Sequence, residues 1–429
     1  MHPSLNDLIS AFVKKCVNLE IAEIERKGKG LRCLEKCGPG QLLLEVPLSK
    51  VINEELIIEL RKKDATFASI ASSEDWDVMP FRKQVLFILC YFKGLHEKET
   101  EWNLYLSTFP SYVGTPVQWS EWEIQSLQGT SLFMPVVAKQ KFLREEWEEL
   151  NSTHESLWSG EISLPDWIHA DSLYNSRCLE SPSGSTVLSP VVDLCNHSNH
   201  ANSRWDFTSD SLQVYAEKTI SNGDEITFNY GASKGAAEFL FSYGFIPQNV
   251  RENTTDVIKL LIPKDPNDPL DIIKRKCCKR PPMIEIASDS TGIWWHAPYL
   301  YFSILNYEDF TCFGLQENEH GDIEPQWEFE GHRTTIEELP DLIQKSSLRD
   351  LYYLRVFCLV QQLAEAAFKH NIESENSISS RKDAAMYLLL RERNLLTKVI
   401  PYIQGFVEEF AQSEIVCNYL AAQETEGEQ

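Results

Sequence analysis

The sequence predicts an α+β protein in which short strands are split by a helical insertion and followed by a mainly helical C-terminal domain. Apolar runs of strand length end at glycines in both 18–52 and 186–249, as strands commonly do. Residues 53–185, between these parts, are rich in Trp, Leu and Glu at helical spacing. We therefore expect one split domain over 1–249 and a second domain over 250–429.

The N-terminal part of the split domain is expected to follow an amphipathic helix. Apolar residues from Leu5 to Cys16 recur at helical spacing. A strand from Ile21 to Ile24 then leads to Lys27-Gly28-Lys29-Gly30, and a second strand, Gln41 to Val46, follows a Gly-Pro-Gly turn. Glycines let a backbone approach a ligand closely. Taken alone, however, this glycine pair is typical of an ordinary hairpin turn.

The insertion is predicted to be helical, with strongly periodic segments at 81–95 and 139–150. A further helix is expected to begin near Pro165 and to end near Arg177. Trp102, Tyr105 and Leu106 are spaced so that they share one helix face. We interpret most of the aromatic residues in this insertion as core.

The stretch from Pro190 to Phe245 carries the candidate chemistry. Its β-branched start predicts a buried strand that breaks at Asp193 into a polar cluster running from Asn196 to His200. A second strand, Glu225 to Tyr230, stops at a glycine, and a short helix over 236–242 leads to Tyr243. Polar side chains at the ends of buried strands are a common place for ligands.

The C-terminal domain is expected to contain a strand over 256–262 and long helices over 348–370 and 380–410. A basic cluster, Lys274 to Arg280, lies before the long helices. We interpret this cluster as a solvated loop, with a nuclear signal as the alternative.

Charge and cysteine content restrict the partners and the compartment. The net charge of -24, from 64 acidic and 40 basic residues, argues against direct nucleic-acid binding and favours a basic protein partner. A role of the acidic residues in solubility alone would also explain this net charge. Eleven irregularly spaced cysteines without a secretory leader favour free thiols in the cytoplasm or nucleus. No apolar run is long enough for a membrane span, and we expect a monomer.

As an ordered set, these motifs resemble the SET-domain lysine methyltransferases, in the branch typified by the Rubisco large-subunit and ribosomal-protein methyltransferases. The matching elements are Gly28-x-Gly30, Asp193-x-x-Asn196-His197, the Gly223-Asp224-Glu225-Ile226 turn, Tyr230, and Tyr243-Gly244-Phe245. The resemblance implies a β-rich SET fold of small, pseudoknotted sheets and a helical substrate-binding domain of the Rubisco-methyltransferase type. It also implies S-adenosylmethionine as the cofactor and no metal.

The resemblance further implies a role for individual residues. Tyr230 is the expected catalytic residue, and Asp193 and Tyr243 are the expected substrate-binding residues. The expected cofactor-binding residues are Lys27, Gly28, Lys29, Arg177, Asn196, His197 and Tyr230. Methyl transfer from a sulfonium to an amine is an in-line displacement, so alignment matters more than acid–base chemistry. An unperturbed phenol titrates near ~10, and Tyr230 is therefore expected to position the amine rather than to deprotonate it.

The residues leave other functions open. Cys195, His197 and His200 could be ligands of a zinc ion, although the close pair Cys277 and Cys278 lacks the spacing of a zinc knuckle. A protein-histidine methyltransferase of the same fold and an inactive SET-fold scaffold are further alternatives. For the lysine enzyme we expect a non-histone substrate, a ribosomal protein or translation factor, with a histone less favoured.

Overall fold

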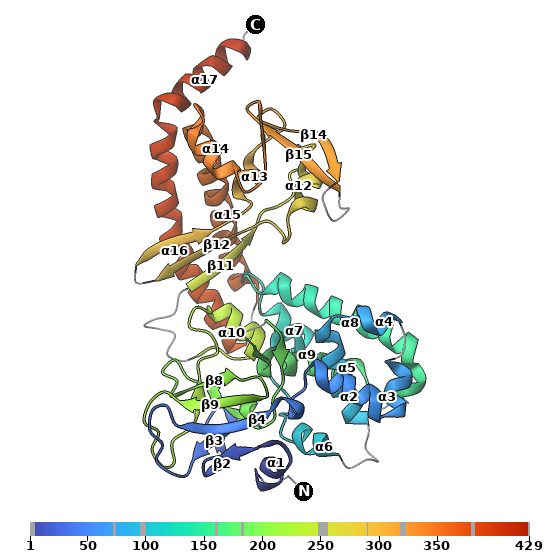
Figure 1. The fold of residues 1–429 in the computed structure, drawn as a ribbon. Helices are drawn as coiled ribbons and strands as arrows, with labels where there is room; N and C mark the ends of the chain where they lie inside the picture. The colour runs from blue at the N-terminus through green and yellow to red at the C-terminus, as the bar shows by residue number, and fades with distance from the viewer. Residues whose placement is uncertain are drawn as a thin grey trace. The chain divides into compact units, whose positions relative to one another are not determined.

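The computed structural model describes residues 5–71, 74–94, 100–158, 162–181, 184–247, 256–289, 291–317, 323–378 and 382–427. It divides into two compact units (Figure 1). The first unit comprises residues 1–121, 134–234 and 238–251. The second comprises residues 122–133, 235–237 and 252–429.

The first unit contains small sheets, as the α+β class predicts. An antiparallel four-stranded sheet has the order β1-β4-β9-β8, and three pairs of strands accompany it, of which β7 and β10 are parallel. The strands are β1 (Lys15–Cys16), β2 (Leu19–Ile24), β3 (Gly28–Cys33), β4 (Leu42–Pro47), β5 (Leu179–Glu180), β6 (Thr186–Val187), β7 (Asn196–His197), β8 (Ser203–Phe207), β9 (Ser211–Ala216) and β10 (Thr227–Phe228).

Helices fill the insertion, and side-chain caps explain where several begin. Asn53 accepts a hydrogen bond from the Leu56 amide at the start of α2, and Ser163 forms a capping box at the start of α9. The helices of the insertion are α2 (Glu54–Lys63), α3 (Ala65–Ile70), α4 (Glu74–Val78), α5 (Phe81–Gly94), α6 (Glu101–Leu106), α7 (Glu121–Gln125), α8 (Phe133–Trp158) and α9 (Leu164–Arg177). Two further helices lie outside the insertion, α1 (Leu5–Phe12) and α10 (Ala236–Tyr243).

The prediction of a buried strand that ends at Asp193 is wrong. A 3-10 turn, Val192–Leu194, occupies this position, and the preceding Val191 has a φ of 70°. A β-branched residue rarely adopts this left-handed conformation, which costs on the order of 1 to 3 kcal/mol. Val191 is nevertheless fully buried, so the surrounding core holds the turn in place. The turn, rather than a strand end, aims the residues that follow it.

Distant parts of the chain meet around β3. The Leu31 carbonyl accepts a hydrogen bond from the Ile226 amide at 2.8 Å, and the Cys33 carbonyl accepts one from the Gly223 amide at 2.7 Å. The Nζ atom of Lys27 lies 2.8 Å from a carboxylate oxygen of Glu225, which is 198 positions away in the sequence. The first glycine motif and the later polar cluster are therefore parts of one site.

The second unit contains both strands and helices. Its two antiparallel sheets have the orders β11-β12-β13 and β14-β15-β16. The strands are β11 (Asp256–Leu261), β12 (Met283–Asp289), β13 (Gly292–His296), β14 (Phe310–Glu317), β15 (Ile323–Phe329) and β16 (His332–Thr334). The helices are α12 (Asp271–Cys277), α13 (Leu300–Ile304), α14 (Leu339–Lys345), α15 (Arg349–Ser377), α16 (Asp383–Ala411) and α17 (Glu414–Gly427).

The long helices confirm the predicted helical C-terminal region. α15 and α16 pack against β11 and β12 through a common apolar core that includes Ile284, Val360 and Leu396. Apolar residues recur along both helices at the spacing that produces such a buried face. Within the described part of the chain, no helix is both long and apolar enough to cross a membrane.

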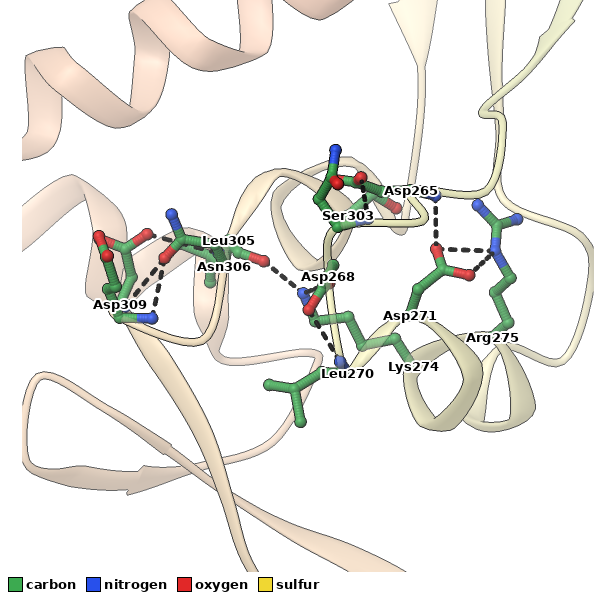
Figure 2. A network of polar contacts seen from close by, with 12 residues as sticks. Asp265, Asp268, Leu270, Asp271, Lys274, Arg275, Ser303, Leu305, Asn306 and Asp309 are labelled. Atoms are coloured by element: carbon green, nitrogen blue, oxygen red, sulfur yellow. Dashed lines mark hydrogen bonds and ion pairs between the residues drawn. The ribbon is translucent and has the colours of Figure 1, made fainter.

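The basic cluster in this unit is only in part the solvated loop that the sequence predicts: Lys279 and Arg280 are exposed outside the helix, but Lys274 and Arg275 are not. Lys274 lies on α12 and is only 4% exposed. Its ammonium contacts a carboxylate oxygen of Asp268 at 2.7 Å and donates to the Leu305 carbonyl (Figure 2). On the same helix, Arg275 is paired with Asp271. At least these two basic residues are structural, because an unpaired buried charge would be strongly destabilising.

A short segment of the insertion belongs to the second unit. The Asn371 side chain, on α15, donates to the Gly129 carbonyl at 3.2 Å, and Lys382 contacts Glu123 at 2.7 Å. The Ser131 amide and hydroxyl both donate to the Glu392 carboxyl group on α16. Polar contacts therefore connect residues 122–133 to the two long helices.

Buried Glu392 is expected to make the stability of this unit depend on pH. It is only 3% exposed, and burial raises its pKa from 4.5 to about 7. The folded state therefore binds this proton more tightly than the unfolded state. The resulting stabilisation, on the order of 3 kcal/mol, is present below pH 4.5 and is lost as the pH rises towards 7. Glu392→Gln should reduce this dependence when thermal unfolding is compared between pH 5 and 8.

The matched control for this prediction is Glu365→Gln, because Glu365 is exposed on α15. This variant should keep the pH dependence of the wild type. If both variants retain the same dependence, the Glu392 carboxyl group is not its source.

Candidate active site

The second glycine of the Gly28-x-Gly30 motif lies against Asn196. A Cβ atom at Gly30 would lie 2.6 Å from the Asn196 amide nitrogen and 2.8 Å from a side-chain carbon of Ile24. The same amide group donates to the Lys29 carbonyl at 3.2 Å and to Glu225 at 2.9 Å. The amide oxygen is therefore the end of Asn196 that remains to accept a hydrogen bond from a ligand.

Lys27 reaches the polar cluster with its side chain. Its ammonium contacts Glu225 at 2.8 Å and donates to the His197 carbonyl at 3.3 Å. Glu225 thus receives donors from both Lys27 and Asn196, which fixes the two predicted cofactor-binding residues relative to each other. Lys29 contributes through its carbonyl group. Gly28 begins β3 with a φ of 75°, which glycine tolerates without strain.

The His197 ring is neutral and held in one tautomer. Its Nδ1 atom accepts a hydrogen bond from the Tyr230 amide at 3.2 Å, so the proton is assigned to Nε2, which lies 2.8 Å from the Asn199 side-chain oxygen. Burial lowers its pKa below the ordinary value of 6.5. This ring therefore orients the backbone at Tyr230 and carries no charge at neutral pH.

The two predicted tyrosines lie together. The centres of the Tyr230 and Tyr243 rings are 4.8 Å apart. The Tyr230 hydroxyl donates to the Cys195 carbonyl at 2.8 Å, and the Tyr243 hydroxyl donates to the Tyr230 carbonyl at 3.2 Å. Because each hydroxyl proton is used in one of these hydrogen bonds, the oxygen lone pairs can accept a hydrogen bond from an incoming group. Burial also raises the pKa of Tyr230, so its hydroxyl stays protonated.

The glycine after Tyr243 fixes the end of α10. Gly244 has a φ of 79°, and a Cβ atom there would lie 2.6 Å from the backbone at Val113 and Gly114. Any other residue would be strained and would also clash with backbone atoms. The Tyr243-Gly244 pair therefore packs against the 113–115 loop of the insertion.

Asp193 and Arg177 form a buried ion pair. An Nη1 atom of Arg177 donates to both the carbonyl and the Oδ2 atom of Asp193 at 3.1 Å, and the Tyr105 hydroxyl donates to the same Oδ2 atom at 3.0 Å. Burial alone raises the pKa of Asp193 and lowers that of Arg177. The Asp193 carboxylate reverses the effect on Arg177 and raises the pKa of the guanidinium above its ordinary value, so we infer that the pair stays ionised.

One atom of this ion pair lacks a partner. The Oδ1 atom of Asp193 is buried and accepts no hydrogen bond from the described residues. A buried acceptor without a donor is costly, and such atoms call for an explanation. A donor on a bound ligand would satisfy this carboxylate oxygen.

The sequence missed three residues of this site. Glu225 was part of a motif but was given no role, although it holds both Lys27 and Asn196. Tyr105 lies in the core, as the sequence predicts, but its hydroxyl also contacts Asp193. Lys234, between the two tyrosines, has no role that the sequence predicts. Of these three residues, only Glu225 could have been found from the sequence, because its carboxylate lies within the Gly223–Ile226 motif.

The structure gives the zinc alternative little support. Both ring nitrogens of His197 already make hydrogen bonds within the protein, and binding a metal would require breaking one of them. Cys195 is fully buried, which raises the pKa of its thiol. Within the described residues, no group of three or more His, Cys, Asp or Glu side chains is arranged to hold a metal ion.

Comparison with known proteins identifies relatives of the chain. The family model described as SET domain matches residues 28–231. SET domain-containing protein 8 of Schizosaccharomyces pombe is 46% identical over 423 residues, which cover 98% of this chain and 99% of that protein. The [fructose-bisphosphate aldolase]-lysine N-methyltransferase of Arabidopsis thaliana is 27% identical and matches 57% of this chain and 52% of its own length. Actin-histidine N-methyltransferase of Xenopus tropicalis is 23% identical over 61% of this chain and 45% of its own length.

Solved structures share the fold. The structure of Rubisco LSMT bound to AdoMet superposes with a TM-score of 0.69 at 16% identity, covering 96% of this chain and 92% of that chain. The SET domain of LSMT bound to lysine and AdoHcy gives a TM-score of 0.66, also at 16% identity, covering 96% and 94% of the two chains. These matches confirm the predicted SET fold with a helical C-terminal region.

Proposed function

Because the chain belongs to the SET-domain family, we propose that it transfers a methyl group from S-adenosylmethionine to a lysine side chain of a non-histone protein. The observation that carries this proposal is the convergence of the Gly28–Gly30 strand, Asn196 and the two tyrosines at one place. None of these three elements would support the proposed methyl transfer by itself.

The residues present fit the proposed cofactor. The Asn196 amide oxygen is oriented by two donor contacts of its own nitrogen, and the buried Oδ1 atom of Asp193 awaits a donor. We propose that Lys27, Gly28, Lys29, Asn196 and His197 hold the cofactor, with Arg177 supporting it through Asp193. When bound, S-adenosylmethionine supplies an electrophilic methyl group.

The chain's own residues would orient the amine and exclude water. The Tyr230 hydroxyl donates its hydrogen bond to the Cys195 carbonyl, so its oxygen lone pairs can accept from an N–H group of the incoming lysine. Tyr243 forms another wall of the lysine channel. An amine that is bound between these half-buried rings loses part of its hydration, which favours its neutral, nucleophilic form. Tyr230 is thus a positioner and not a general base.

Lysine is the proposed acceptor, and histidine is the second candidate. The presence of Tyr243 in the Tyr-Gly-Phe motif favours lysine. The actin-histidine N-methyltransferases among the relatives are the observation that keeps histidine open. Mass spectrometry that locates the methyl group on a product peptide separates the two. The inactive-scaffold alternative predicts no transfer at all.

A basic protein, such as a ribosomal protein or translation factor, is the proposed substrate. The net charge of -24 supports a cationic partner over nucleic acid or an anionic membrane. We propose that residues 252–429 contribute to gripping it, and that a monomer works in the cytoplasm, the nucleus or both. No disulfide joins the eleven cysteines, all of which lie in the described part of the chain, and this supports a reducing compartment.

The proposed function is tested by incubating the full chain with labelled S-adenosylmethionine and a ribosomal-protein fraction. We expect label on lysine, and calorimetry should show that a chelator leaves cofactor binding unchanged. Loss of binding on chelation would contradict the metal-free site. Absence of both cofactor binding and transfer, to this fraction and to a whole-cell lysate, would overturn the proposed function.

Gly30→Ala is expected to weaken cofactor binding by about tenfold or more, equivalent to roughly 1.4 kcal/mol. The added methyl group would push the Asn196 amide away from Lys29 and Glu225. Calorimetric titration with S-adenosylmethionine measures the change. Gly38→Ala is the matched control, because a Cβ atom there meets nothing within 4 Å. Equal affinities in the two variants would show that Asn196 does not depend on close packing with β3.

A further inference from the structure

Lys234 lies in the loop between the two tyrosines and reaches back to one of them. Its ammonium donates to the Tyr243 hydroxyl at 2.7 Å, and its side chain is only 28% exposed. That hydroxyl donates onward to the Tyr230 carbonyl at 3.2 Å. Lys234, Tyr243 and the Tyr230 backbone therefore form a continuous chain of hydrogen bonds.

The loop is shaped to hold this lysine. A Cβ atom at Gly231 would lie 2.8 to 2.9 Å from three methylene carbons of Lys234, so the glycine provides the space for the aliphatic stem. The Lys234 amide also donates to the Gly231 carbonyl at 3.3 Å. Its acidic neighbour on α10, Glu238, has a carboxylate oxygen 4.0 Å from the ammonium and is about half exposed. The loop and the tyrosine, more than an acidic partner, fix the position of the ammonium.

Lys234 contributes net positive charge near the tyrosines. Arg177 and Asp193 neutralise each other in a buried pair, and the His197 ring is uncharged. Glu238 offsets Lys234 only in part, because the Glu238 side chain is about half exposed and its charge is screened by water. The titratable or charged groups near the tyrosine pair are Arg177, Asp193, Cys195, His197, Lys234 and Glu238.

We propose that Lys234 is a positioning residue for methyl transfer: it directs the Tyr243 hydroxyl proton towards Tyr230 and disfavours protonation of the incoming amine. This inference rests on the proposed lysine methyltransferase function. Like charges a few ångströms apart repel strongly where burial limits screening. A lysine substrate beside Tyr243 would therefore release its proton to solvent more readily when Lys234 is charged.

The test compares pH–rate profiles of wild type, Lys234→Met and Lys234→Arg, with labelled S-adenosylmethionine and a ribosomal-protein fraction. In the Met variant, the acidic limb of kcat should move up by about one pH unit, which corresponds to a roughly tenfold loss near neutral pH. The rates should converge at alkaline pH, and KM should not rise. Lys234→Arg keeps the charge and should restore the profile.

A matched control is Lys141→Met, which removes an exposed lysine that also has a glutamate four residues later. Its profile should equal that of the wild type. An unchanged profile in Lys234→Met, or a rate that falls equally at every pH, would overturn the role of Lys234 while leaving the proposed function intact. If the wild type transfers no methyl group to any lysine, the proposed function fails and this inference fails with it.

Discussion

Tyr230→Phe is expected to reduce methyl transfer by about 100-fold or more while the chain remains folded. The substitution keeps the ring contacts with Tyr243 and His197 but removes the hydroxyl that is proposed to orient the amine. Losing one preorganised hydrogen-bonding group at a transition state commonly has an effect of this size. Turnover on the ribosomal-protein fraction, with thermal unfolding of the same samples, measures both quantities.

The structure also sets the expected effect of Tyr230→Phe on stability. The lost hydroxyl donates to the Cys195 carbonyl, so unfolding should become easier by about 1 kcal/mol. Cofactor affinity should fall only modestly, because Asn196 and β3 are unchanged.

Tyr215→Phe is the control for the catalytic variant. It removes a hydroxyl that is hydrogen-bonded to Gln213 within β9, outside the site, and should leave turnover unchanged. A folded, cofactor-binding Tyr230→Phe enzyme with near wild-type turnover would reduce Tyr230 to a packing residue. The catalytic assignment would then move to Tyr243.

Arg177→Met is expected to destabilise the first unit by about 3 to 5 kcal/mol. The variant leaves the Asp193 carboxylate buried without its counter-charge, and breaking one side of a buried pair commonly costs this much. Thermal unfolding should show a large decrease in the melting temperature. The double variant Arg177→Met/Asp193→Asn should recover part of the loss, because it removes the uncompensated charge.

An exposed ion pair provides the comparison for Arg177→Met. Arg204 and Asp206 lie 3.2 Å apart, and each side chain is at least half exposed. Arg204→Met should therefore cost less than about 1 kcal/mol. Equal losses in the two arginine variants would mean that the buried pair contributes no more than a surface contact.

Regular periodicity and ordered motifs made much of the fold predictable. The expected helix over 81–95 is found as α5, Phe81–Gly94, and the expected helix over 348–370 is found as the longer α15, Arg349–Ser377. Both segments repeat apolar residues over several turns, which is the clearest local signal of a helix. In the site, the motif residues predicted to act together do lie together.

The errors arose where tertiary contacts override local preference. The β-branched residues before Asp193 favour a strand, but the core imposes a left-handed conformation on Val191. Lys274 looked like a solvated charge because its partner at the Leu305 carbonyl is 31 positions away. Tyr105 lies in the predicted core, but its contact with Asp193, 88 positions away, was not predicted. A single sequence contains no local signal for contacts of this kind.

The long separation between the segments around β3 also has a consequence for folding kinetics. Lys27 contacts residues 170 and 198 positions further along the chain, and β7 pairs with β10 in parallel across the intervening hairpin. Such non-local contacts require costly loop closure and generally form late. A nascent chain that stops before residue 225 lacks the partner that joins Lys27 to Asn196. We therefore expect catalytic competence to appear only near the end of folding of the first unit, well after its local helices have formed.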